Sequence, residues 1–312
     1  MKKFLALMLA LLLCLSALGA TAEIPEEKKP VETELDGGVV ASMHTFNAKI
    51  YEAECEQPGT IERLDYTTAV YGDGVTYQQW ANVYLPYGYD ETRQYNILYF
   101  FHGTNETQNS FIAEPIVKNV VDNMIFYGVC DPFIIVCPTY YYVYENRTVQ
   151  HDVFPLEVRN DLMPAVESKY STYAETADEA GFIASRAHRA ISGYSQGCHA
   201  CWNNAYVNFD LAKWIVPMSG SSVDNLQAMK DAFAAKPGYE DDTFFILCSG
   251  GKRDLAYEGT VALANAMLAD EAFSYGTDPQ ENNFYVAISK DLHQTLKGRN
   301  NLYSILVDVL FK

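Results

Sequence analysis

Ser195 lies between two glycines in a Gly-Tyr-Ser-Gln-Gly segment, residues 193–197. An apolar, strand-like segment leads into it, and a helix-compatible segment, residues 198–207, follows. This is the pattern of a nucleophile elbow, in which the glycines keep a tight strand-to-helix turn uncrowded and the turn lifts the serine hydroxyl clear of the sheet. Ordinary glycine-rich turns show the same five residue types, so the rest of the chain must decide between the two.

A serine hydroxyl is a weak nucleophile at neutral pH and needs an imidazole within about 3 Å to take its proton. The imidazole in turn needs a carboxylate on its far nitrogen, which fixes its tautomer and orientation. Asp254 and His293 each follow a predicted buried strand, residues 243–248 and 284–289. The order serine, aspartate, histidine is that of α/β-hydrolases and differs from the order in chymotrypsin and subtilisin. The chain therefore predicts Ser195 as nucleophile, His293 as base and Asp254 as acid.

Two other acids compete with Asp254 for the third position. Asp291 is two residues from His293 on the same loop, where side-chain geometry is awkward, and Glu258 is a weaker rival. The other histidines lie in the leader, in a loop, before the elbow strand or on the helix after it: His44, His151, His188 and His199. His102 ends a predicted strand, and we expect it to be a structural histidine that bonds nearby backbone.

The tetrahedral intermediate of acyl transfer carries an oxyanion, which two N–H donors must stabilise. The backbone of Gln196, the residue after the nucleophile, is expected to supply one donor. The second is expected from the turn that follows the predicted strand 97–101. In this turn Thr104 is the expected donor, and Gly103 allows a close approach of the backbone.

A run of tyrosines follows the predicted strand 133–136, at the end that faces the expected cleft. Tyr140, Tyr141 and Tyr142 offer apolar ring faces with polar tips, which suits stacking on a sugar or a phenolic ring. Two interpretations stay open for each of them, which are contact with the substrate and burial in the core.

The apolar pattern predicts an α/β fold. Strands over residues 61–70 and 79–85, joined by turn-forming residues, predict antiparallel strands at one edge of a sheet. From residue 97 onward, continuous apolar segments alternate with helical ones, which predicts a mostly parallel central sheet with helices on both faces. Besides the elbow strand, the expected strands are 97–101, 133–136, 213–218, 243–248 and 284–289, and the expected helices are 115–125, 154–169, 223–235, 261–272 and 299–311.

Residues 1–22 have the features of a signal peptide. Lys2 and Lys3 form a basic start, an apolar segment covers residues 4–18, and small residues stand at the expected cleavage site. The apolar segment is too short for a comfortable membrane span. We therefore expect secretion, with no membrane anchor after cleavage. Residues 23–48, rich in Glu, Lys, Pro and Gly without apolar periodicity, predict a flexible leader.

The 312-residue chain is 49% hydrophobic, which suits one large catalytic domain over residues 49–312. Its formal net charge of -18 argues against nucleic acid or an anionic membrane as a partner, because both need a basic face. A solvated acidic surface is sufficient to explain this charge.

Six cysteines follow the signal segment, namely Cys55, Cys130, Cys137, Cys198, Cys201 and Cys248. An exported protein can pair cysteines, but Cys137 and Cys248 end predicted core strands, where a free cysteine behaves as a small hydrophobe. The sequence leaves the pairing undecided. Cys198 and Cys201 lie three apart on a predicted helix with no second ligand pair, so we predict no metal site there.

Several segments together resemble bacterial esterase-D-type proteins, and most of all the first carbohydrate esterase family, the secreted feruloyl and acetylxylan esterases. The segments are residues 81–90, the strand into His102-Gly103, residues 166–173 and residues 185–197. The resemblance covers about residues 58–312. It implies an α/β-hydrolase fold without metal or organic cofactor, with Ser195, Asp254 and His293 as the triad and the backbones of Thr104 and Gln196 as oxyanion donors.

The chain departs from this family at two places. The family often has further glycines after His-Gly, where this chain has Thr104 and Asn105, and it often has methionine at the position of Gln196. Backbone donors survive both changes, but the acyl pocket can differ.

The leading hypothesis is a secreted serine esterase that removes feruloyl or acetyl groups from plant cell-wall polysaccharide such as xylan. Its partners would be esters of cell-wall polysaccharides or oligosaccharides. One alternative is another ester on the same fold, such as S-formylglutathione or a siderophore ester, or an acyl transfer. The export signal counts against the first of these. A second alternative is a non-catalytic carbohydrate-binding protein on a hydrolase scaffold.

Overall fold

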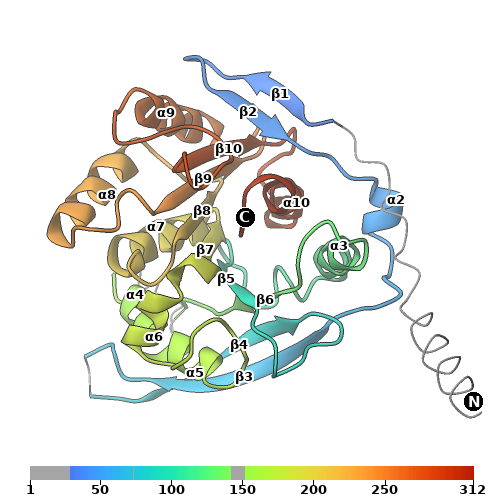
Figure 1. The fold of residues 1–312 in the computed structure, drawn as a ribbon, viewed down its shortest axis with the longest axis vertical. Helices are drawn as coiled ribbons and strands as arrows, with labels where there is room; N and C mark the ends of the chain where they lie inside the picture. The colour runs from blue at the N-terminus through green and yellow to red at the C-terminus, as the bar shows by residue number, and fades with distance from the viewer. Residues whose placement is uncertain (1–28, 73, 142–151) are drawn as a thin grey trace, which may run out of the picture.

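The computed structural model describes residues 29–72, 74–141 and 152–312. Its centre is an eight-stranded sheet in the order β10-β9-β8-β7-β5-β6-β4-β3 (Figure 1). The strands are β3 (Thr60–Thr68), β4 (Tyr77–Leu85), β5 (Asn96–Phe101), β6 (Phe133–Cys137), β7 (Arg189–Tyr194), β8 (Trp214–Met218), β9 (Phe244–Ser249) and β10 (Phe284–Ile288). Strands β5 to β10 run parallel, and β4 and β3 add an antiparallel edge. The predicted fold class is confirmed.

Helices cover both faces of the sheet. Figure 1 shows α3 and α10 on one side and α4 to α9 on the other. The longer helices are α3 (Pro115–Phe126), α7 (Gln196–Asn208), α8 (Asp224–Ala235), α9 (Tyr257–Leu268) and α10 (Gly298–Asp308). The shorter ones are α2 (Ala48–Tyr51), α4 (Phe154–Glu157), η2 (Val158–Leu162), α5 (Met163–Glu167), α6 (Glu179–Ala184), η3 (Arg186–His188) and η4 (Thr295–Lys297).

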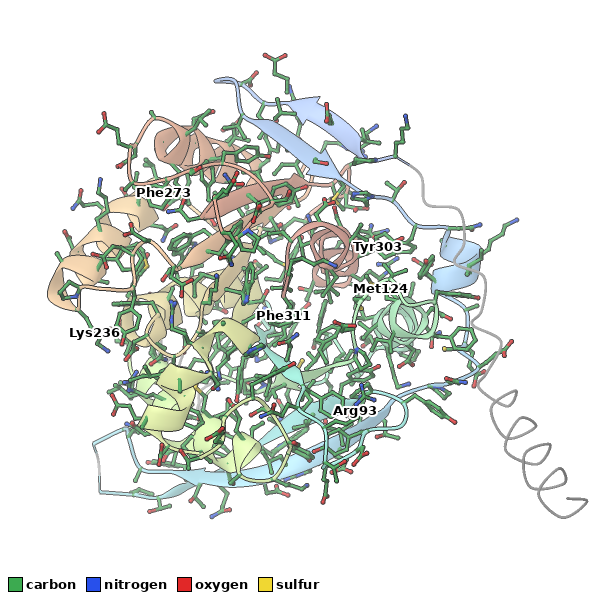
Figure 2. The ribbon with its side chains drawn as sticks, in the orientation of Figure 1. Arg93, Met124, Lys236, Phe273, Tyr303 and Phe311 are labelled. Carbon is green, nitrogen blue, oxygen red and sulfur yellow. The ribbon has the colours of Figure 1, made fainter. Side chains whose placement is uncertain are left out.

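Alternation along β5 explains the continuous apolar run at residues 97–101. Tyr99 and Phe101 pack into the core cluster under α4 to α9, whereas Phe100 packs into the cluster on the opposite face. That opposite cluster includes Met124 of α3 and Tyr303 of α10 (Figure 2). A strand buried on both faces needs apolar side chains at every position, and this is the pattern that the sequence shows.

The predicted helix 154–169 is interrupted in the structure. Its middle turn, η2, is a π-helix, and Pro164 then stands in the first turn of α5. A proline at the start of a helical segment loses no hydrogen bond within that segment. The wide π-turn thus separates two short α-helices and accommodates Pro164.

The prediction of a flexible leader over residues 23–48 is wrong for residues 31–43. Strands β1 (Val31–Glu34) and β2 (Val40–Met43) form an antiparallel hairpin. The hairpin lies beside the β10 edge of the domain (Figure 1), and Leu35 and Ala41 are buried in the main core cluster. The strands are four residues long, so their periodicity is too brief to show in the sequence. The signal segment predicted over residues 1–22 lies outside the described residues.

The described cysteines, Cys55 to Cys248, are all free, and five of the six are buried. Within the described ranges, no helix is both long and apolar enough to traverse a bilayer.

A buried ion pair ties the elbow strand to its neighbours. Arg189, the first residue of β7, donates to both carboxylate oxygens of Glu167 at 2.7 Å. The two side chains are 1% and 0% exposed. The hydroxyls of Tyr99 and Thr172 donate to the same carboxylate. The Glu167 carboxylate therefore connects α5 to β5 and β7.

The variant Glu167→Gln should lower the free energy of unfolding by about 3–5 kcal/mol, because the buried guanidinium of Arg189 would lose its counter-charge. Urea unfolding followed by tryptophan fluorescence measures the change. The exposed Glu175→Gln removes the same charge from the surface and serves as the control. A loss smaller than about 1 kcal/mol, the range of an exposed pair, would contradict the role given to this carboxylate.

Candidate active site

The turn after β7 forces Ser195 into an unusual backbone conformation. Its φ is 57° and its ψ is -117°. Residues other than glycine rarely adopt this backbone conformation. The N–H of Ser195 donates to the carbonyl of Met218 on β8 at 2.9 Å, which fixes the turn against the sheet. A side chain at Gly193 would lie 2.1 Å from the carbonyl oxygen of Gly197. The glycine on the strand side of the serine is thus required by a close backbone approach.

Ser195, His293 and Asp254 form one chain of hydrogen bonds. The Nε2 atom of His293 lies 2.8 Å from Ser195 Oγ, and its Nδ1 atom lies 2.7 Å from Asp254 Oδ1. Asp254 follows β9 and His293 lies between β10 and η4. An ionised carboxylate can only accept, so Nδ1 carries the proton and Nε2 keeps a lone pair for the serine hydroxyl. The structure thus brings together the three residues predicted from the sequence.

The Asp254 carboxylate is held ionised by the groups around it. Oδ2 accepts from Ser219 Oγ at 2.7 Å and from the N–H of Gly250 at 2.9 Å, and Oδ1 also accepts from the N–H of Ala256 at 2.9 Å. Burial alone raises the pKa of Asp254, but the bonds from His293 and from these three donors outweigh it and lower the pKa to about 2. The carboxylate is therefore charged at neutral pH, as the orientation of His293 requires.

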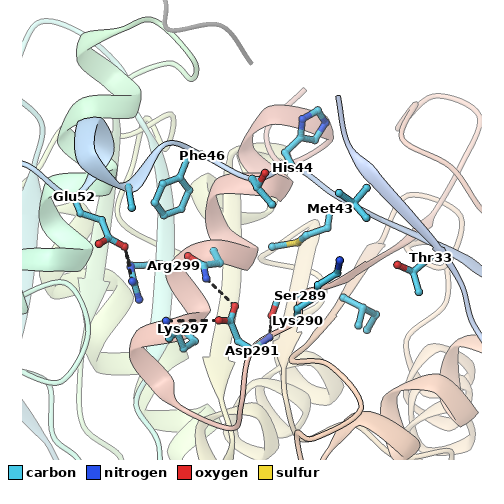
Figure 3. A pocket seen from close by; sticks show the side chains of 15 residues that line it. Thr33, Met43, His44, Phe46, Glu52, Ser289, Lys290, Asp291, Lys297 and Arg299 are labelled. Atoms are coloured by element: carbon cyan, nitrogen blue, oxygen red, sulfur yellow. Dashed lines mark hydrogen bonds and ion pairs between the residues drawn. The ribbon is translucent and has the colours of Figure 1, made fainter. Parts of the chain in front are cut away.

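The two rival acids point elsewhere. Asp291 lines a separate cavity of about 360 Å³ (Figure 3). There its carboxylate lies 2.7 Å from Asn300 Nδ2 and 3.6 Å from Lys297 Nζ. Glu258 is exposed in the first turn of α9. Both ring nitrogens of His293 are already engaged by Ser195 and Asp254, so neither rival takes the acid position.

The carbonyl of Gly103 is anchored on the interior side of the turn after β5. It accepts from His102 Nδ1 at 2.9 Å, from the Tyr140 hydroxyl at 3.3 Å and from the N–H of Glu106 at 3.3 Å. In a trans peptide the C=O and the following N–H point in opposite directions. The N–H of Thr104 is therefore aimed away from these interior groups.

The N–H of Thr104 differs from the N–H groups on either side of it, which both have acceptors. The N–H of Gly103 donates to Glu106 Oε2 at 2.6 Å, and that of Asn105 donates to the Tyr141 hydroxyl at 2.7 Å. Among the described residues, Thr104 N–H has no such acceptor, and Thr104 lines the same cleft as Ser195. This arrangement suits an oxyanion donor.

His102 holds its neighbours as a neutral ring. Burial lowers the pKa of His102 to about 4, despite the hydrogen bond to the Gly103 carbonyl. With its proton on Nδ1, the ring donates to that carbonyl, and its Nε2 atom accepts from the Thr139 hydroxyl at 2.8 Å. This is the structural role that the sequence predicted for His102.

Gln196 begins α7, where the first N–H groups of a helix have no partner within the helix and the helix dipole favours negative charge. Its backbone thus sits at the expected place for the other oxyanion donor. Its side chain turns aside, since Gln196 Oε1 accepts from the Tyr141 hydroxyl at 3.3 Å.

The structure decides between the two interpretations for one residue of the tyrosine run. Tyr140 is fully buried and its hydroxyl donates to the carbonyl of His102 at 2.7 Å, so the predicted contact between Tyr140 and the substrate is wrong. Tyr141 is 9% exposed and links Asn105 to the elbow helix. A substrate contact by Tyr141 stays a prediction, and Tyr142 lies outside the described residues. Both described hydroxyls bind backbone groups of residues 102–105.

The cleft above Ser195 has a volume of about 570 Å³. Its lining consists of Gly103, Thr104, Glu106, Tyr194, Ser195, His293, Gln294, Thr295 and Leu296. The sequence did not predict Glu106, Tyr194 and Thr295 as cleft residues, although each is close in sequence to a predicted site residue. The Tyr194 ring lies 5.2 Å from the His293 ring, and its hydroxyl accepts from the N–H of Gln294 at 2.8 Å. In the part of the chain that the structure describes, no cluster of His, Cys, Asp and Glu is arranged to hold a metal.

The chain is similar in sequence and structure to known esterases and to parts of xylanases. A family model described as "Putative esterase" matches residues 78–221. A solved structure of the feruloyl esterase module from Clostridium thermocellum, a serine-to-alanine mutant complexed with sinapinate, is 30% identical with a TM-score of 0.76 and covers 86% of this chain and 93% of that one. Among curated proteins, endo-1,4-beta-xylanase Y of Acetivibrio thermocellus is 33% identical over 246 residues, which is 77% of this chain.

The matched region is only part of the curated relatives. The alignments span 22% of that xylanase and 18% of an endo-1,4-beta-xylanase/feruloyl esterase of Xylanibacter ruminicola, which is 27% identical over 149 residues.

A parallel sheet that ends in a serine elbow, with an aspartate and a histidine after later strands, defines an α/β-hydrolase, and the esterase relatives make it a carboxylic ester hydrolase. The chain belongs to the first carbohydrate esterase family, with the feruloyl esterase module as a relative over nearly its whole length.

The variant Asp254→Asn should lower kcat by about 10⁴-fold while the protein stays folded, because an amide leaves the imidazole in the wrong tautomer. Steady-state hydrolysis of an aryl acetate measures this loss. Asp291→Asn is the matched control, since it neutralises the rival acid, and it should stay within about threefold of wild type. Similar losses in both variants would contradict the assignment of Asp254.

The variant Tyr140→Phe should lower kcat by about tenfold with little change in KM. It removes the hydroxyl that bonds the carbonyls of His102 and Gly103, so the peptide that carries the Thr104 N–H is held less firmly. Complete loss of an oxyanion donor costs about 10²–10³-fold, which sets the upper limit. Tyr87→Phe, on an exposed ring, is the control, and an unchanged kcat for Tyr140→Phe would contradict the role given to Tyr140.

Proposed function

We propose that this protein is a secreted serine esterase that removes feruloyl or acetyl groups from plant cell-wall polysaccharide such as xylan. The observation that carries the proposal is the unbroken chain of hydrogen bonds from Ser195 through His293 to Asp254, with distances of 2.8 and 2.7 Å. It stands at the edge of an open cleft in a member of an esterase family.

Each residue of the site has a defined role in the proposed mechanism. Ser195 Oγ attacks the ester carbonyl while Nε2 of His293 takes its proton. The N–H groups of Thr104 and Gln196 bind the oxyanion, and Asp254 stabilises the imidazolium. His293 then gives the proton to the departing sugar hydroxyl, which leaves an acyl group on Ser195. Water, deprotonated by His293, attacks this acyl-enzyme. The bond from the acyl carbon to Ser195 Oγ then breaks, and His293 returns its proton to Ser195 as the free acid leaves. The chemistry needs no metal or organic cofactor.

The substrate proposal is supported by the relatives. One solved relative is a feruloyl esterase module bound to sinapinate, and the curated relatives are named as xylanases, one of them also as a feruloyl esterase. Secretion is supported by the basic start and apolar segment of residues 1–22. The net charge of -18 is compatible with a neutral polysaccharide and disfavours nucleic acid.

The variant Ser195→Ala should lose at least about 10³-fold of the kcat/KM for methyl ferulate and aryl acetates, because the nucleophile is absent. A fluorophosphonate should label Ser195 in the wild type, detected by peptide mass spectrometry, and should not label the variant. Ser168→Ala, on an exposed helix end, is the control. Full activity in Ser195→Ala would overturn the mechanism, and an unlabelled, inactive wild type would favour the non-catalytic binding protein.

Release of ferulate and of acetate from arabinoxylan fragments, measured side by side, then identifies the acyl group. Neither acid released, with aryl acetates still cleaved, would favour another ester as the substrate.

A further inference from the structure

One acidic side chain in the cleft has no place in the mechanism above. Glu106 lines the cleft together with Ser195 and His293 and is half-buried. Its Oε2 atom accepts from the N–H of Gly103 at 2.6 Å, and the carboxyl is also hydrogen-bonded to the hydroxyl of Thr295. Gly103 belongs to the turn that carries the Thr104 donor, whereas Thr295 lies two residues after His293. The carboxyl thus spans the two segments that face each other across Ser195.

The setting is costly for a carboxylate. Burial raises the pKa of Glu106, and the bonds from Gly103 and Thr295, with the nearby His293, only partly offset it. Among the described residues, no lysine or arginine forms an ion pair with Glu106. A negative charge beside a developing oxyanion also works against catalysis unless it is compensated. A group in such a position needs a specific benefit to offset these costs.

The packing around Gly103 shows how tightly the three residues fit. A Cβ atom on Gly103 would lie 2.9 Å from Glu106 Oε2 and 2.9 Å from Thr295 Oγ1. Contacts this short force one of the atoms to move, so glycine at position 103 leaves the space in which the carboxyl meets both segments. A side chain at position 103 would therefore displace the Glu106 carboxyl or the Thr295 hydroxyl from these positions.

The turn itself is strained and needs support. Asn105 has a φ of 62°, which costs free energy in a residue with a side chain and persists where neighbouring contacts fix it. Glu106 closes the turn twice, since its N–H donates to the Gly103 carbonyl at 3.3 Å and its carboxyl accepts from the Gly103 N–H. Both peptide groups that flank Gly103 are therefore fixed by one residue.

We propose that Glu106 is a positioning residue that joins the turn at Gly103 and Thr104 to the loop that carries His293 and Thr295. This proposal rests on the proposed esterase function. Its bond to the Gly103 N–H orients the turn so that the Thr104 N–H faces the reacting carbonyl. Its bond to Thr295 keeps the loop that carries His293 at a fixed distance from that donor. Glu106 touches neither the nucleophile nor the acyl group in this role.

The test compares two replacements of Glu106. Glu106→Ala removes both bonds and should lower kcat for an aryl acetate by about 10- to 100-fold, below the loss of a complete oxyanion donor, with KM within about threefold. Glu106→Gln keeps an acceptor for the Gly103 N–H and an NH₂ group that can donate to Thr295, so it should recover kcat to within about fivefold of wild type. The rate of fluorophosphonate labelling at Ser195 should follow kcat in all variants.

Two further variants control for the loss of a negative charge and for a failure of Glu106→Ala to fold. Glu91→Ala removes an exposed acid outside the cleft and should leave kcat unchanged. Thr295→Val removes only the hydroxyl and should lower kcat by several-fold even if Glu106→Ala fails to fold. A wild-type kcat in folded Glu106→Ala, or an equal loss in the Ala and Gln variants, would overturn the positioning role while leaving the esterase function intact. A wild type that neither hydrolyses esters nor reacts with fluorophosphonate at Ser195 would overturn both.

Discussion

The active site depends on one close backbone approach, that of the elbow helix to the end of β5. A side chain on Gly197 would lie 2.1 Å from the carbonyl oxygen of Phe101 and 2.5 Å from that of His102. Since β5 and β7 are adjacent parallel strands, the turns that leave their carboxyl ends are neighbours. The positive φ of Ser195 and this close approach then bring the start of α7 next to the residues that end β5. The proposed oxyanion site is the consequence of this packing.

The order of the remaining strands distributes the polar groups. β8 lies between β7 and β9, and its end carries Ser219, a residue with a φ of 53° whose hydroxyl bonds the Asp254 carboxylate from the elbow side. β10 lies beside β9 at the edge of the sheet. The loop after β10 places His293 against both Asp254 and Ser195. Each strand end thus contributes one polar group to a single line of hydrogen bonds. The contribution of Ser219 is a support for the acid rather than contact with substrate.

The sequence predicted the features that repeat along the chain or follow a fixed order. Continuous apolar runs located β5 and β6, and the order of Ser195, Asp254 and His293 matched one fold. It did not predict what depends on contacts between distant segments. The Tyr140 hydroxyl meets a backbone carbonyl that is 38 residues away, and no local pattern records such a bond. The hairpin at residues 31–43 escaped prediction because its four-residue strands are stabilised by burial against the domain.

The neutral, buried ring of His102 has a consequence for behaviour in acid. Because burial depresses its pKa from 6.5 to about 4 in the folded protein, the unfolded chain binds this proton more readily between those values. Stability contributed by the neutral ring therefore declines as pH falls below 6.5, and the loss is complete below about 4. The bond from His102 to the Gly103 carbonyl persists over most of that interval. Moderate acid would thus reduce the fraction of folded molecules before it altered the shape of the site in those that remain.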